Sequence, residues 1–182
     1  AQANNIATGR IRLHSYRAGE GLYNPEHNHP EFLIETSSID DVYYEINKEG
    51  WHVGIYNEMP KVIAETAKYK TGNSLPFVLA SIHKKEKNWD DCLLLNTNGE
   101  IAEATSSNIF IFKEGKLQTP PENSGAVSGV MRRVLLKLAR KIGMDAVEKS
   151  INKDDLLAAQ EVFLTNTIWG IRWVKQFETA TY

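Results

Sequence analysis

One ten-residue segment, EATSSNIFIF, constrains the fold of this chain more than any other. It opens with the carboxylate of Glu103, passes through four small residues and Asn108, and ends in an apolar strand. A half-buried strand would alternate between apolar and polar side chains rather than begin with a run of small polar ones. An unpaired carboxylate in apolar surroundings is costly, so Glu103 needs a cationic partner. The small residues after it indicate that a flat ligand lies against this segment.

Strand and turn signals fill much of the remaining chain. Strands are expected over residues 10–17, from residue 32 onward, and over 51–56, 146–151 and 162–165. Asn98-Gly99 and Glu114-Gly115 each lie between apolar runs, and they predict two β-hairpins.

Helical periodicity is found in two longer segments and a short third one. The first helix begins after Asn73 or Ser74 and runs towards Asn88, with apolar residues at Leu75, Val78, Leu79 and Ile82. The second begins at Ser128, ends at Gly143, and has on one face Val130, Val134, Leu135, Leu138 and Ile142. A short helix is expected over 153–159. Because helices and strands mix without strict alternation, the sequence predicts an α+β or irregular α/β fold.

Composition excludes several classes of function. The chain has 182 residues, 42% of them hydrophobic, which suits one globular domain with a real core. The net charge of −2 and the scattered basic residues argue against a nucleic acid or a membrane surface as partner. No apolar stretch reaches the roughly 18 residues of a membrane helix. The single cysteine, Cys92, cannot form an internal disulfide, so a buried strand position and a reducing, cytoplasmic compartment are expected.

The candidate reactive residues are few. His27 and His29 are one residue apart, but no further His or Cys lies at a useful local spacing, so no metal site is predicted. Lys70 stands at an element boundary before the first helix, where a lysine can point into a cleft, although an isolated lysine there is usually just exposed. The hydroxyls of Ser106 and Ser107 have no neighbouring histidine in the sequence to activate them.

Two short segments could bind an anion. Ser128-Gly129-Val130 begins a helix, and Thr165-Asn166-Thr167 ends a strand. A lysine amine can form a Schiff base, a carboxylate can keep a ring nitrogen protonated, and a helix start with hydroxyls can hold a phosphate. These are the needs of pyridoxal 5′-phosphate, which we therefore expect as the cofactor.

Several of these segments together resemble one enzyme family. Lys70-x-x-Asn73, DDCLLLNTNGEIAEATSSNIFIF, KEGKLQTP, SGVMRRVLL and DLLAAQEVFLTNTIWGIRWV follow one another in the order typical of class IV aminotransferases. This family has fold type IV, the D-amino-acid-aminotransferase-like fold. It includes branched-chain aminotransferase, D-amino-acid aminotransferase and aminodeoxychorismate lyase. The resemblance covers residues 4–174.

The resemblance implies a role for each matching position. Lys70 would anchor the cofactor and move the α-proton of the substrate. Glu103 would contact the pyridine nitrogen, and Asn108 would be structural. The phosphate would lie against Gly129, Val130, Met131 and Thr167. Arg12 falls near the place of a substrate-carboxylate arginine in some members of the family.

The resemblance leaves three functions open. The first is an aminotransferase acting on an amino acid and a 2-oxo acid. The second is a 4-amino-4-deoxychorismate lyase, favoured by Met131, where many transaminases have threonine. The third is a non-catalytic family member. The resemblance also implies a homodimer.

The family also sets an expectation for the domains. Residues 1–182 would form its large C-terminal cofactor-binding domain, with residues 1–10 as a remnant of the interdomain link. The small N-terminal domain of the family would be absent, and with it an arginine that contacts the phosphate.

Overall fold

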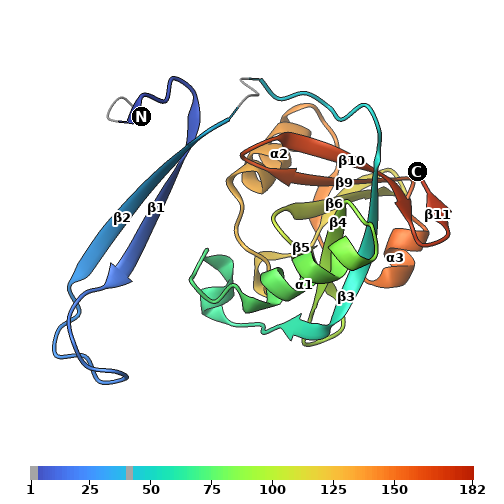
Figure 1. Ribbon diagram of the computed structural model, residues 1–182. Helices are drawn as coiled ribbons and strands as arrows, with labels where there is room; N and C mark the ends of the chain where they lie inside the picture. Colours follow the sequence, from blue (N-terminus) through green and yellow to red (C-terminus); the bar gives the residue numbers. More distant parts are fainter. Residues whose placement is uncertain (1–3, 40–42) are drawn as a thin grey trace. The chain divides into compact units, whose positions relative to one another are not determined.

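A computed structural model describes residues 4–39 and 43–182 (Figure 1). The chain divides into two compact units, Ala1–Tyr43 (unit 1) and Tyr44–Tyr182 (unit 2). The assignment of the whole chain to one cofactor-binding domain, with residues 1–10 as a link, stays a prediction.

Unit 1 contains a two-stranded antiparallel ribbon. Strand β1 (Gly9–Arg17) pairs with β2 (Pro30–Ser38) along its full length, and this confirms the two strands predicted there. Side chains alternate across the ribbon, so Leu13 and its partner Ile34 share one face and both are exposed.

Unit 2 is built on one mixed sheet. In its described residues, nine strands pair in the order β5-β4-β3-β10-β9-β6-β7-β8, with β11 added to β10. The strands are β3 (Trp51–Lys61), β4 (Asp91–Asn96), β5 (Ile101–Ala104), β6 (Asn108–Lys113), β7 (Lys116–Thr119), β8 (Ala146–Glu148), β9 (Glu161–Asn166), β10 (Gly170–Phe177) and β11 (Ala180–Thr181).

This sheet curls until its ends meet. Strand β5 lies five strand positions from β6, about 24 Å in a flat sheet. Only residues 105–107 join the two strands, and such a link spans at most about 14 Å. The backbone N–H of Ile101 also donates to the carbonyl of Ile151, just beyond β8, at 2.8 Å. The turn 105–107 therefore lies at the seam of a nearly closed sheet.

The hairpin predictions are confirmed. Strands β4 and β5 turn at Asn98-Gly99, and β6 and β7 turn at Glu114-Gly115. Gly99, Glu114 and Gly115 all have positive φ, as tight hairpin turns require. Strand β10, by contrast, has no counterpart among the predicted elements.

Three α-helices and two 3-10 helices complete unit 2. Helix α1 (Leu75–Glu86) follows the 3-10 helix η2 (Glu65–Lys68), α2 (Val130–Lys141) follows η3 (Glu122–Ser124), and α3 (Lys153–Leu157) begins with a capping box between Asn152 and Asp155. Side chains alternate along β4. Cys92 and Leu94 therefore pack against α1, whereas Leu93 packs in the core formed by the other strands of the sheet. No helix in residues 4–39 or 43–182 is long and apolar enough to cross a bilayer.

Helix α2 corrects one expectation. The predicted apolar face is largely exposed, at Val130, Val134, Leu138 and Ile142. The buried face instead carries Arg132, Leu136 and Ala139. Arg132 can be buried because its guanidinium donates to the carbonyl of Pro120 at 2.8 Å and pairs with Glu148. Periodicity located the helix, but a paired arginine changed which face is buried.

Candidate functional site

The centre of the candidate site is the carboxylate of Glu103 on β5. It is 3% exposed and forms an ion pair with the amine of Lys61, at the end of β3. The amine of Lys61 also lies 4.6 Å from the ring centroid of Phe77. The predicted cationic partner of Glu103 therefore exists. It is a lysine that sequence reasoning did not single out, because nothing near residue 61 in the sequence relates it to Glu103.

Burial and neighbouring charges act on Glu103 in opposite directions. Burial raises the pKa of Glu103 above its usual range, while the charge of Lys61 opposes this rise. The backbone N–H of Val127 and the charge of Lys70 also lower the pKa of Glu103, though not enough to cancel burial. Burial therefore outweighs the nearby positive charges in setting the direction of the shift.

Glu103 and Asn108 hold the segment that leads into α2. The backbone N–H of Val127 donates to Oε2 of Glu103 at 3.1 Å, and Nδ2 of Asn108 donates to the carbonyl of Val127 at 2.8 Å. A Cβ added to Gly129 would lie 2.0 Å from Oδ1 of Asn108, so only glycine fits at that contact. Glu103 and Asn108 therefore position residues 127–129, which agrees with a structural role for Asn108.

The start of α2 offers backbone donors to an anion. Gly129, rather than the predicted Ser128, is the N-cap, and it makes no side-chain cap hydrogen bond. The hydroxyl of Ser128 is engaged elsewhere, since it donates to Oε1 of Glu122 at 2.6 Å. The N–H groups of Val130 and Met131 lie in the first turn, where no helical partner is available. These N–H groups could hold a phosphate.

The segment that carries Lys68 and Lys70 is bonded to the residues just before α2. The backbone N–H of Ser128 donates to the carbonyl of Lys68 at 2.9 Å. The Lys68 amine donates a hydrogen bond to Glu65, and this bond raises the pKa of the amine. In the described residues the Lys70 amine has no hydrogen-bond partner, and Lys70 is exposed. The chemical role expected for Lys70 stays a prediction.

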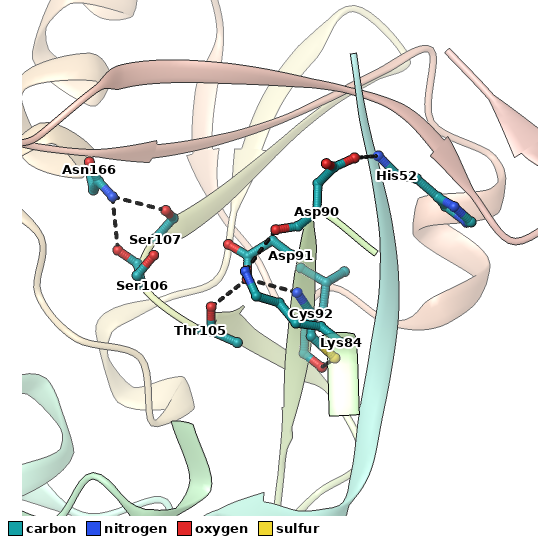
Figure 2. Close-up of polar contacts among 10 residues, drawn as sticks. His52, Lys84, Asp90, Asp91, Cys92, Thr105, Ser106, Ser107 and Asn166 are labelled. Atoms are coloured by element: carbon teal, nitrogen blue, oxygen red, sulfur yellow. Dashed lines mark hydrogen bonds and ion pairs between the residues drawn. The ribbon is translucent and has the colours of Figure 1, made fainter. Parts of the chain in front are cut away.

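The turn after β9 places Thr167. Oδ1 of Asn166 accepts the backbone N–H groups of Ile168 and Trp169, at 2.9 and 3.1 Å. Nδ2 of Asn166 donates to the turn 105–107, at the carbonyl of Ser106 and the hydroxyl of Ser107 (Figure 2). Asn166 thus joins the turn that follows Glu103 to the turn that carries Thr167.

A buried acidic residue supports the same seam. Asp91 is 1% exposed, and its carboxylate accepts a hydrogen bond from the Thr105 hydroxyl. It also accepts one from the backbone N–H of Cys92, at 2.7 Å (Figure 2). The amine of Lys84 lies 3.9 Å away, and burial raises the pKa of Asp91. Apart from the acidic pair Asp90-Asp91 at the start of β4, no local pattern in the sequence predicts this contact.

Three further candidate residues lie in unit 1. Arg12 lies in unit 1 on β1, where it pairs with Glu35 across the ribbon at 3.5 Å, so its substrate role stays a prediction. His27 and His29 also lie in unit 1, with ring centroids 5.6 Å apart. Within residues 4–39 and 43–182, no group of three or more His, Cys, Asp or Glu side chains could hold a metal ion.

Comparison with known proteins decides the family. The model of the family Amino-transferase class IV matches residues 1–177. This chain belongs to the class IV aminotransferases. The branched-chain-amino-acid aminotransferase of Escherichia coli K12 is 32% identical to this class IV chain over 128 residues, 70% of the chain and 40% of that enzyme. Across the first curated relatives, the matched part spans 34–40% of their length.

Solved structures show the same fold. The 4-amino-4-deoxychorismate lyase of Pseudomonas aeruginosa aligns with 94% of this class IV chain and 64% of its own, with a TM-score of 0.83 and 24% identity. The branched-chain aminotransferase of Thermobaculum terrenum, solved in its PLP form, aligns with 98% of this chain and 59% of its own, with a TM-score of 0.84 and 23% identity. The predicted α+β, fold-type-IV architecture is confirmed.

Proposed function

We propose that this chain carries the cofactor-binding part of a pyridoxal-phosphate enzyme that transfers an amino group between an amino acid and a 2-oxo acid. The observation that carries the proposal is the segment 127–129. Its backbone is bonded to Glu103, to Asn108 and to Lys68, and it leads directly into the start of α2. The carboxylate of Glu103, the start of α2 and the backbone of Lys68 are thereby connected within unit 2, and Lys70 follows two residues after Lys68.

The residues of this site suit pyridoxal 5′-phosphate. Glu103 has one oxygen engaged by Lys61 and the other by Val127, and each carboxylate oxygen has a second lone pair that can accept a ring N–H. The N–H groups of Val130 and Met131 and the hydroxyl of Thr167 are donors of the kind that a phosphate needs. Lys70 supplies the amine that anchors the aldehyde.

Each residue would have a defined task in the reaction. Pyridoxal 5′-phosphate, when bound, supplies an electron sink for the charge that develops when the substrate loses its α-proton. Nζ of Lys70 would take that proton from the α-carbon and return it during the transfer. The carboxylate of Glu103 would hold a proton on the ring nitrogen, and the charge of Lys61 favours the ionised carboxylate that this requires.

Replacement of Lys70 tests the proposal directly. The wild-type protein should develop absorbance near about 410 nm when pyridoxal 5′-phosphate is added, and borohydride should attach the cofactor to Lys70. Lys70→Ala should abolish both the attachment and turnover. Lys68→Ala is the matched control, two residues away, and it should keep both. Attachment to Lys68, or turnover by Lys70→Ala, would reject the assignment. A wild-type protein without absorbance would favour a non-catalytic family member.

The lyase remains the second candidate because of Met131. A side chain without a hydroxyl stands in the first turn of α2, where many transaminases have threonine. Incubation with 4-amino-4-deoxychorismate and no amino acceptor separates the two functions. Pyruvate released under these conditions would show the lyase. Conversion of a 2-oxo acid only when an amino donor is present would show the aminotransferase.

The proposal extends to the substrate class and to the assembly. Branched-chain amino acids are the proposed substrates, which the name of the Escherichia coli relative supports. A homodimer is proposed from the family resemblance. A cytoplasmic location is proposed from the single buried cysteine, Cys92. Substrate profiling and sedimentation analysis of the protein test the first two.

A further inference from the structure

The first residues of unit 2 contact the turn that carries Thr167 and the strand that follows it. Residues 44–47, here called the crossing segment, are bonded to β10 at two places. The guanidinium of Arg172 donates to the carbonyl of Glu45 at 2.7 Å. Asn47 exchanges hydrogen bonds with the backbone of Trp173, at 3.0 and 3.2 Å. These contacts fix the crossing segment against the strand that follows the turn.

Tyr44, at the start of the crossing segment, contacts the turn itself. Its hydroxyl donates to the carbonyl of Thr167 at 3.0 Å. Its ring lies against Gly170, where an added Cβ would be 2.9 Å from Cγ of Tyr44. Gly170 has a φ of +76°, which also favours glycine. The ring and the turn are therefore closely fitted to each other.

The Tyr44 contact has a direct effect on the backbone at Thr167. The carbonyl of Thr167 and the N–H of Ile168 belong to one planar peptide group. Tyr44 holds the oxygen of this peptide, and Oδ1 of Asn166 holds its N–H at 2.9 Å. A peptide bonded at both ends cannot rotate without breaking a hydrogen bond. Because this peptide adjoins Cα of Thr167, the direction of the Thr167 side chain depends on it.

We propose that Tyr44 is a positioning residue for the cofactor phosphate: its hydroxyl fixes the 167–168 peptide and thereby aims the Thr167 hydroxyl at the phosphate. This inference rests on the proposed function, in which Thr167 donates to that phosphate. Tyr44 itself need not touch the cofactor. Among the described residues, its hydroxyl is the only donor to the Thr167 carbonyl, so without it no protein group holds this oxygen.

Tyr44→Phe tests this role because it removes the hydroxyl and keeps the ring on Gly170. Tyr44 is 60% exposed, so the variant should fold. We expect its dissociation constant for pyridoxal 5′-phosphate to rise about three- to tenfold, the range expected for one hydrogen bond. Its affinity for pyridoxal, which lacks the phosphate, should not change. Tyr43→Phe, at an exposed neighbouring tyrosine, should leave both affinities unchanged.

Each other outcome is decisive. Equal losses for pyridoxal and pyridoxal 5′-phosphate, or no loss for either, would overturn the role of Tyr44 while leaving the proposed function intact. A wild-type protein that binds neither compound would overturn the proposed function, and this inference with it. A second readout needs no cofactor: the Ile168 amide should exchange with solvent several-fold faster in Tyr44→Phe, and unchanged exchange would also overturn the inference.

Discussion

Replacement of Lys61 by methionine tests the buried ion pair on which the candidate site is built. The side chains of Lys61 and Glu103 are 8% and 5% exposed, so water screens their attraction only weakly. Methionine keeps most of the apolar stem and removes the charge. Loss of one partner from a buried ion pair costs about 3–5 kcal/mol, because the other charge stays buried alone. For a chain of this size, the melting temperature should fall by about 6–20 °C.

The stability lost in Lys61→Met should depend on pH in a defined direction. Burial already raises the pKa of Glu103 in the folded protein, and removal of Lys61 would raise it further. A carboxyl group with a raised folded pKa stabilises the fold below its unfolded pKa of about 4.3, and this stabilisation is lost as the pH rises through the folded pKa. The deficit of Lys61→Met should therefore be small in acid and should grow towards neutral pH.

Urea unfolding of the cofactor-free protein, followed by circular dichroism at about pH 5 and about pH 7.5, measures both effects. Lys68→Met is the matched control, because its partner Glu65 is 83% exposed and the pair should contribute about 0–1 kcal/mol. Lys61→Met combined with Glu103→Gln should recover part of the loss, since no charge is left unpaired. A Lys61→Met variant as stable as Lys68→Met at both pH values would refute the reasoning.

Three further predictions concern residues near the site. Burial raises the pKa of the Cys92 thiol to about 12, so a thiol reagent at neutral pH should label Cys92 only after unfolding; rapid labelling of the folded protein would contradict this. Burial raises the pKa of Asp91, so stability should fall as the pH rises from about 3.9 through the folded pKa. The free energy of unfolding of Asp91→Asn, measured with urea, should therefore increase relative to that of the wild type as the pH rises through this range. A difference between the two proteins that does not change with pH would contradict this prediction. Gly129→Ala should lower the free energy of unfolding by about 1–3 kcal/mol, measured by thermal unfolding, because the new Cβ meets Asn108. Gly72→Ala is the control and should lose little, because a Cβ there meets nothing within 4 Å. Equal losses in the two variants would disprove the contact.

Local structure was predictable where the signal lies within a few residues. Asn98-Gly99 and Glu114-Gly115 determine their own turns, because the positive φ that each hairpin needs is favourable at glycine. Glu103 was recognisable because a carboxylate near the end of a strand, among small and apolar residues, needs a cationic partner. In each case the sequence carries the physical reason next to the residue concerned.

Long-range contacts explain what could not be predicted. Lys61 lies 42 residues before Glu103 and looks like an ordinary strand-end lysine until β3, β4 and β5 pair. The hydroxyl of Tyr44 meets a carbonyl 123 residues later in the chain. Helix α2 shows the same limit, because Arg132 is buried by partners on other segments, and periodicity alone favoured the exposed apolar side.

The curled sheet has a consequence for the order of folding. The contacts of Glu103 with Lys61 and Val127 close chain segments of 42 and 24 residues, and contacts of such separation form late because the loops must close first. The binding groups therefore come together only when the last strands have joined. A ligand gathered by them can add stability to the finished protein, but it cannot guide the early chain towards that state.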